Sequence, residues 1–416
     1  IVLSYLMHLA NGDGTVPETD ENIMNKLSGN HMYPYGGVYI YRTPRTFASF
    51  TTRCSIMGLT MPEDGLWDIT SDFQGLTGII KEKDPDDDFF ADKKVNWKDI
   101  GIETLRENLE EYGKGFSILA EVPRASGAVL QISSFTALPD GKTVYAEKCK
   151  AVADVEIGTY NTGKITIGNE NFETIPKRAK GYKDIYFNGE REQFYGNYEG
   201  ENITVSKTDI KHINMDGKIG YVLHGSCGIE YLNRHKYPKW KGLEDTLILN
   251  KREPGFMIAG ETTEIFAVVS MPNTTIYEME KECADVSVTC EKDSLLIMRV
   301  GQRRVSVNFS SEKIMAEEET KIKSSLVQIF PGRTSIKENN MKTAYMLNGF
   351  TSSVSEACAV LEMEDPANMD IICTDSKATV INKSKANISF KYFAGKAGKN
   401  IVMEEGEALE LPCGSN

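Results

Sequence analysis

Hydrophobic and polar residues alternate with a period of two through most of the chain. In residues 36–57, GGVYIYRTPRTFASFTTRCSIM, aliphatic residues alternate with Tyr39 and Tyr41, and a second alternating run follows Pro44. Successive side chains of a strand point to opposite faces, so this period predicts two strands with a bend between them. Comparable strand patterns occur at residues 116–122, 128–138, 164–167, 219–224, 264–271, 294–300 and 304–309.

Helical signals are fewer. Residues 1–10 and 18–28 predict short helices, and Asn96 suits the N-cap of a longer one that places Leu105, Leu109 and Tyr112 on one face before Gly113 ends it. Turn sequences such as PDG and MDG separate the strand patterns. The number and spacing of the strands predict an all-β protein with two stacked antiparallel sheets and a few short helices.

A charged interruption, AEEETKIK at residues 316–323, divides the chain. After it the strand patterns become shorter and richer in Ser, Asn and Lys, and the remaining length suits a small separate sandwich. We therefore predict a short helical segment at 1–28, a large β-domain at 29–318 and a small C-terminal β-sandwich at 319–416.

Composition places the chain among globular proteins and excludes some functions. Its 416 residues are 40% hydrophobic and 26% charged, which is enough to build a core. The net charge of −13 argues against a broad nucleic-acid interface. The apolar first ten residues are too short to span a bilayer, and we expect residue 1 to be a processing boundary. The motifs of lipases, zinc proteases and nucleotide-binding enzymes do not occur.

Cysteine and acidic residues give weak indications of bound metals. The eight cysteines form no C-x-x-C pair, so they predict no zinc site. Cys283 and Cys290 could bridge neighbouring strands or remain free thiols. The acidic run EKDPDDDFFAD offers Asp84, Asp86 and Asp88 as Ca²⁺ ligands, but it lacks the EF-hand order. An exposed acidic loop is the favoured interpretation, and no cofactor is expected.

Two segments combine aromatic rings with cations, the residue types that bind acidic sugars through stacking and charge pairing. The segment around residues 234–240 contributes Arg234, His235 and Trp240 as substrate-binding candidates, and it could equally be a solvated loop. The other segment, residues 31–45, could equally be a strand with exposed tyrosines and charge pairs. Its candidates are His31 and Tyr35 as an acid/base pair, and Tyr39, Tyr41, Arg42 and Arg45 as substrate-binding residues.

Several segments, in order along the chain, resemble the hyaluronate and chondroitin lyases. GGVYIYRTPRTFASFTTRCSIMG resembles the start of their central β-domain, and NMDGKIGYVLHG is similar to a following hairpin. Residues 264–311 resemble the paired strands that come next, and FKYFAGKAGKNIVMEEGEALELP is compatible with the small terminal sandwich. The β-domains of heparinase-like or alginate lyases fit nearly as well. The resemblance implies a large antiparallel β-supersandwich of the galactose-mutarotase type, followed by a small β-sandwich.

The resemblance also implies β-elimination on uronic-acid polysaccharides. That reaction neutralises the uronate carboxylate, removes the C5 proton and protonates the leaving oxygen. The family carries most of these groups on an N-terminal α/α toroid, of which residues 1–28 would be a remnant. Where the family has a supporting Glu and Asn, this sequence has Cys54 and Met57, so the usual contribution of this turn is in doubt.

We therefore expect the β-region of a polysaccharide-lyase-like protein, secreted or at the cell surface, or periplasmic in a Gram-negative source. It would form one wall of a cleft for an anionic polysaccharide, with an upstream toroid as a partner, and without a nucleic-acid partner or a membrane span. The alternative is a non-catalytic carbohydrate-binding or structural protein with the same fold. A mutarotase-type enzyme is a third interpretation, by analogy of fold alone. Whether the chain is an enzyme stays open; if so, it would be a polysaccharide lyase.

Overall fold

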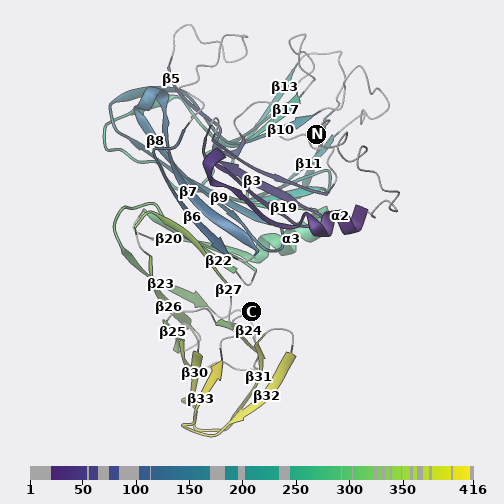
Figure 1. Ribbon diagram of the computed structural model, residues 1–416, viewed down its shortest axis with the longest axis vertical. Coiled ribbons are helices and arrows are strands. Elements are labelled where there is room, and N and C mark those ends of the chain that lie inside the picture. The colour runs from purple at the N-terminus through teal and green to yellow at the C-terminus, as the bar shows by residue number, and fades with distance from the viewer. Residues whose placement is uncertain are drawn as a thin grey trace.

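Antiparallel strands make up nearly all of the regular structure, which confirms the predicted all-β class (Figure 1). The only α-helices in the described part are α2 (Asp20–Lys26) and α3 (Ile276–Ala284), and the 3₁₀ turns are η1 (Pro34–Gly36), η2 (Gly75–Thr77) and η3 (Ala125–Gly127). The computed structural model describes residues 20–53, 56–63, 75–83, 103–112, 114–168, 183–194, 202–233, 244–291, 293–301, 303–321, 326–329, 333–337, 340–347, 349–356, 359–362, 369–373, 377–394 and 397–412.

Two large sheets form the body of the protein. The nine-stranded sheet has the order β12 (Glu190–Phe194), β11 (Lys183–Phe187), β14 (His212–Met215), β15 (Ile219–His224), β19 (Phe266–Pro272), β9 (Thr143–Ala151), β8 (Val129–Ala137), β7 (Gly115–Arg124) and β6 (Arg106–Tyr112). The six-stranded sheet has the order β13 (Ile203–Lys207), β16 (Ile229–Asn233), β17 (Glu244–Arg252), β10 (Val155–Gly168) and β18 (Gly255–Met257), and β5 (Ile79–Glu82) also pairs with β10.

A third sheet, of β1 (Gly29–Tyr33), β2 (Val38–Arg42), β3 (Phe47–Thr51) and β4 (Met57–Met61), shares one core with these two. Phe50 of this sheet stacks on Phe135 of the nine-stranded sheet with ring centroids 5.5 Å apart. Tyr231 and Leu247 of the six-stranded sheet are buried in the same core. The β1–β4 sheet and the six-stranded sheet therefore both cover one face of the nine-stranded sheet.

The opposite face of the nine-stranded sheet packs on a four-stranded sheet. This sheet has the order β20 (Val286–Glu291), β21 (Leu295–Val300), β22 (Arg303–Asn308) and β27 (Thr351–Glu356). Leu296 and Val305 pack in one core with Val144 and Val269 of the nine-stranded sheet. The main body is thus a three-layer arrangement rather than a simple pair of sheets.

The C-terminal part forms smaller sheets at the lower end of the molecule in Figure 1. They are β23 (Ile314–Lys321), β26 (Asn340–Leu347) and β25 (Arg333–Lys337); β24 (Leu326–Ile329), β28 (Ala359–Glu362), β31 (Ile388–Ala394) and β32 (Ala397–Met403); and β29 (Met369–Cys373), β30 (Lys377–Asn382) and β33 (Ala408–Pro412). Leu361 and Phe390 of one sheet share a core with Ile371 and Val380 of another, as expected for a small sandwich.

Strand β27 follows the predicted boundary at residue 318 in the sequence but belongs to a sheet of the main body. It pairs with β22 along its whole length, from Arg303↔Glu356 to Asn308↔Thr351. Ser352 on this strand also accepts a 2.7 Å hydrogen bond from Ser134 of the nine-stranded sheet. The C-terminal segment therefore completes a sheet of the main body as well as forming its own sandwich.

The helix expected before Gly113 is wrong where the structure describes it. Residues 106–112 form β6, which pairs antiparallel with β7 from Arg106↔Glu121 to Tyr112↔Gly115. Leu109 packs against the main core, whereas Leu105 is exposed. A strand pairing with β7 satisfies this backbone within the sheet, and that tertiary contact overrides the helical spacing of the leucines.

Candidate functional site

The turn between β1 and β2 sets the geometry of the candidate site. Gly37 follows η1 with φ +60°, a left-handed conformation that favours glycine. A Cβ there would lie 2.6 Å from Thr52 Oγ1 and 2.8 Å from Arg53 Cγ. The Gly37 carbonyl also accepts a 2.7 Å hydrogen bond from the backbone N–H of Thr52. Glycine at this position therefore lets the stem of Arg53 lie directly against the turn.

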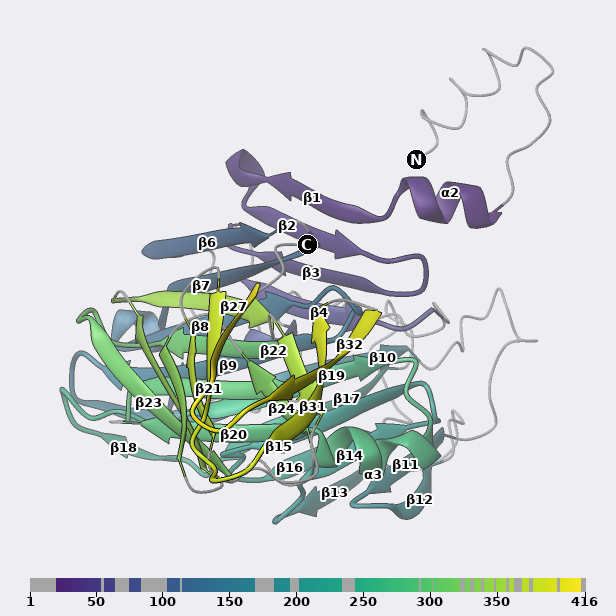
Figure 2. The same ribbon diagram turned by 90° about the horizontal axis from the view of Figure 1, so that it is seen from below.

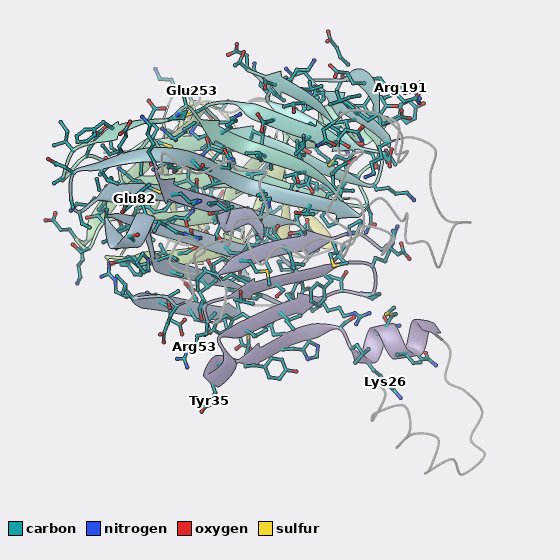
Figure 3. The ribbon with its side chains drawn as sticks, turned by 90° about the horizontal axis from the view of Figure 1, so that it is seen from above. Lys26, Tyr35, Arg53, Glu82, Arg191 and Glu253 are labelled. Atoms are coloured by element: carbon teal, nitrogen blue, oxygen red, sulfur yellow. The ribbon has the colours of Figure 1, made fainter. Side chains whose placement is uncertain are left out.

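Tyr35 and Arg53 meet at the outer corner of the β1–β4 sheet, where Figure 3 shows both side chains beside the turn. The Arg53 guanidinium donates to the Tyr35 backbone carbonyl at 2.9 Å. The Tyr35 side chain is 95% exposed, and that of Tyr33, at the other side of Pro34, is 56% exposed. The corner therefore presents aromatic rings and a cation to solvent.

The alternation of side chains places further candidates on the outer face of the same sheet. Met32 packs against the main core, and the Asn30 amide donates to the backbone carbonyl oxygens of Tyr112 and Gly115, so these two residues point inward. His31 and Tyr33 alternate with them and so point outward. We define the outer face by His31, Tyr33, Val38, Ile40 and Arg42, which share this side in the β1–β2 register.

Two arginines of this region have no acidic partner in the part of the chain that the structure describes. Within the described residues, Arg53 makes no ion pair, and Arg42 donates only to the Met24 sulfur of α2, at 2.7 Å. Arg45, in contrast, is 2.7 Å from the Glu63 carboxylate. From Val38 to Arg42 the strand rises about 14 Å, so Arg53 and Arg42 lie towards opposite ends of β2. In a chain with a net charge of −13, this is a local positive edge.

Tyr39 and Tyr41 are not available to stack on a sugar. Their side chains are 1% and 4% exposed and belong to the main core. The Tyr39 hydroxyl donates to the Glu107 carboxylate at 3.0 Å, and the Tyr41 hydroxyl donates to the Pro139 carbonyl at 2.9 Å. Burial and the Glu107 carboxylate raise the pKa of Tyr39 to about 12. The predicted binding role of these two rings is wrong because the alternation turns them inward.

His31 and Tyr35 are close in sequence, but their side chains have different surroundings. His31 Nε2 lies 2.8 Å from the Leu27 carbonyl oxygen, which can only accept. A neutral His31 therefore carries its proton on Nε2, which leaves Nδ1 to accept one. Within the described part, no hydrogen bond joins His31 to Tyr35. Their role as an acid/base pair stays a prediction.

The second binding segment and the acidic run lie outside the described residues. These are Arg234, His235 and Trp240 in the one case and Asp84, Asp86 and Asp88 in the other. Among the described residues, no group of three or more His, Cys, Asp or Glu is placed to hold a metal ion. No helix in this part has the length and apolar character needed to cross a membrane. Cys283 and Cys290 are free thiols.

The sequence places Tyr33 among the aromatic residues of the first binding segment, but it does not assign Arg53 to the site. The turn PYGG interrupts the period-two pattern, so the alternation of β2 cannot be carried back onto Tyr33 and Tyr35. The glycine pair at 36–37 was the available signal, because it marks a tight turn that exposes its neighbours. Arg53 could be placed only from the contact between the turn and the end of β3.

Other clusters of polar residues serve the interior. Glu147 is fully buried and accepts hydrogen bonds from Tyr145 at 2.7 Å and from Gln131 at 2.6 Å. Asp245 is equally buried and accepts from Tyr231 at 2.5 Å and from Lys183 at 3.0 Å. Burial raises the pKa of Glu147, and its hydrogen bonds oppose the shift. Both carboxyl groups are enclosed by their donors, so they stabilise the sandwich rather than contact a polymer.

No family model matches the chain, and no curated protein matches it. Among solved structures, it is similar to the Streptomyces coelicolor A3 chondroitin AC lyase in complex with chondroitin sulphate (9% identity, TM-score 0.44). The match covers 99% of this chain and 50% of that chain. It is also similar to a chondroitinase AC lyase whose structure was determined in enzyme–oligosaccharide complexes (10% identity, TM-score 0.45). That match covers 98% of this chain and 57% of that chain. A third similar structure is the galactosidase domain of the α-galactosidase–sucrose kinase AgaSK (9% identity, TM-score 0.37). That match covers 58% of this chain and 41% of that chain. This chain spans about half the length of these structures. At such low identities and TM-scores, function is inferred from this chain's own residues.

Proposed function

We propose that this chain binds an anionic, uronic-acid polysaccharide on the outer face of its β1–β4 sheet, as one wall of a cleft. The observation that carries this proposal is the proximity of the exposed rings of Tyr33 and Tyr35 to Arg53, which makes no ion pair among the described residues. Sugar rings have apolar faces that pack on aromatic side chains, and their carboxylates match the guanidinium fork. Arg42 would hold a second acidic unit further along the same strand.

The electrostatic setting supports an acidic ligand over a neutral one. A neutral glycan needs stacking faces alone, whereas this edge keeps two guanidinium groups without ion pairs among the described residues. Cations in such positions attract a polyanion and lose that attraction as salt screens them. We therefore expect binding to weaken as the salt concentration rises.

Cleavage by β-elimination is the finer proposal, and it uses the same face. His31 Nδ1 would accept the C5 proton, and the exposed Tyr35 hydroxyl would protonate the leaving oxygen. An upstream helical domain would supply the remaining groups, as the lyase resemblance implies. Such a role places the protein outside the cytoplasm, where these polysaccharides occur. Without cleavage, the same surface is a carbohydrate-binding module.

The experiment is affinity electrophoresis of the chain through gels containing hyaluronan, chondroitin sulfate, heparin or alginate. Tyr35→Ala and Arg53→Ala should each weaken retardation by about tenfold, because stacking and charged hydrogen bonds each contribute on the order of 1.4 kcal/mol. The controls are Tyr277→Ala, which removes an equally exposed ring (94%) from α3, and Arg45→Ala, which removes a cation already bound to Glu63. Equal losses in all four variants would contradict the proposed site.

Absorbance of the unsaturated uronate product tests cleavage in the same samples. A signal that His31→Ala and Tyr35→Phe both abolish, with binding retained, would support the acid/base assignment. Binding without product would assign this chain the binding role alone. No retardation by any of the four polymers would contradict the proposed function as a whole.

A further inference from the structure

A cavity of about 530 Å³ opens between the nine-stranded sheet and the four-stranded sheet, far in sequence from the β1–β4 edge. Its walls come from the end of β15 and the loop that follows, from the turn between β13 and β14, and from the junction of α3 with β20. Small-molecule sites typically have about 300–1,000 Å³ and lie where two layers meet. The cavity therefore has the size and position of a ligand site.

One wall of the cavity is aliphatic. Val222 on β15 faces Val286 and Val288 on β20, and all three pack at the margin of the core between the two sheets. Ile210 and Ile229 extend this wall. The residues that line the cavity include no Phe, Tyr or Trp, so the wall matches an aliphatic chain better than the face of a sugar.

The other side carries positive charge. Lys207 and Lys211 line the cavity together with one carboxylate, Asp209, so the lining offers two ammonium groups in a strongly acidic chain. Lys207 is bound to Glu192. Lys211 is exposed, and the described residues give its side chain no ion pair. Its ammonium group is therefore available to an anion.

His224 closes one end of the cavity. Its Nε2 lies 3.4 Å from Cys290 Sγ, so the ring spans from β15 to β20. Burial lowers the pKa of His224, and the nearby Glu264 opposes the shift. A neutral imidazole can donate a hydrogen bond to an anion without adding a charge of its own.

We propose that this cavity binds a small aliphatic carboxylate, with its anionic group at Lys211 and its chain against Val286 and Val288. The proposal is separate from polysaccharide binding, since it uses other residues and another pair of sheets. Octanoate is the probe, and 1-octanol is the neutral comparator with the same chain. Isothermal titration calorimetry should show octanoate binding about tenfold more tightly than 1-octanol, as expected for one charged hydrogen bond.

Variants locate the site. Lys211→Ala should remove the preference for octanoate, whereas Lys114→Ala, at an exposed lysine in another turn, should not. Val288→Trp should fill the cavity and abolish binding of both probes. Its matched control is Val402→Trp, at a valine that is 67% exposed on β32.

The thiols give an independent readout in the unaltered protein. Cys227 and Cys283 line the cavity, and Cys290 is not among the lining residues. Saturating octanoate should slow the alkylation of Cys227 and Cys283 by iodoacetamide by about fivefold or more relative to Cys290, since 80% occupancy shields a site to that extent. Equal binding of octanol and octanoate would overturn the anion assignment. If the unaltered protein shows neither a heat of octanoate binding nor slower alkylation of Cys227 and Cys283, the proposed site is overturned. This outcome does not depend on whether Val288→Trp folds.

Discussion

The Arg53 guanidinium donates to the backbone carbonyl of Tyr35 at 2.9 Å, and this contact joins the end of β3 to the turn between β1 and β2. The donor and acceptor are 18 residues apart in sequence. The bond fixes one side of the guanidinium, and among the described residues its other N–H groups have no hydrogen-bond partner. An arginine held in this way loses less side-chain entropy when it binds a carboxylate than a freely rotating one.

Gly37→Ala should disturb this corner. A Cβ would clash with Thr52 and Arg53, and the residue would be held at φ +60°. We expect a loss of about 1–3 kcal/mol in the free energy of unfolding, measured with urea, and weaker polysaccharide binding. Gly189→Ala is the control, because Gly189 has φ +86° but no atom within 4 Å of the added Cβ. Equal losses in both variants would assign the effect to backbone strain alone.

Tyr39→Phe should change the response of stability to alkaline pH. The folded state raises the pKa of Tyr39 to about 12, whereas in the unfolded chain its pKa is near the ordinary tyrosine value of 10.0. Between these values the unfolded state loses its proton first, so the contribution of Tyr39 to stability is present below pH 10 and is lost as the pH rises towards 12.

Urea unfolding of wild type and Tyr39→Phe at about pH 9 and about pH 11 checks this. The variant should have a lower free energy of unfolding than wild type at the lower pH, because the Glu107 carboxylate loses its donor. The difference in free energy of unfolding between the two proteins should be smaller at the higher pH. Tyr33→Phe, at an exposed ring, should show neither effect. A gap that is constant with pH would contradict the assignment.

Glu147→Leu should be among the most damaging single changes in the sandwich. It would leave donors on Tyr145, Gln131 and Asn250 buried without their acceptor. Each unsatisfied donor costs about 1–3 kcal/mol, so we expect a loss of at least about 3 kcal/mol or failure to fold. Glu253→Leu, at an exposed position shown in Figure 3, should change stability by less than about 0.5 kcal/mol. Thermal unfolding by circular dichroism compares the two.

Ser352→Ala should loosen the contact between β27 and the nine-stranded sheet. Its hydroxyl bonds to those of Ser117 and Ser134, and all three residues are buried. We expect a loss of about 1–3 kcal/mol, seen as a lower urea midpoint. Ser353→Ala alters the neighbouring residue on the other face of β27 and should have a much smaller effect. If the two variants match, the hydroxyl cluster does not hold the layers together.

Figure 2, seen from below, shows the C-terminal sheets in front of the main body. A chain cut after residue 318 would lose β27 together with these sheets. It would expose the edge of β22 and the buried hydroxyl groups of Ser117 and Ser134. The charged interruption marks the predicted boundary at residue 318, whereas strand pairing joins β27 to the main body, so the domain division stays a prediction.

The sequence by itself determined the strand class, since alternating residues such as those around Tyr39 and Phe50 can form an amphipathic surface only as strands. It also marked the segment that carries the candidate site. Tertiary structure decided which tyrosines are usable: alternation gives two faces, but only packing against Phe116 and Phe135 shows which face is buried. Likewise, Leu105 and Leu109 have helical spacing, and only the pairing of β6 with β7 makes a strand there. Local patterns fix periodicity, whereas the side that meets a core, and the arginine that meets a turn, depend on contacts between residues distant in sequence.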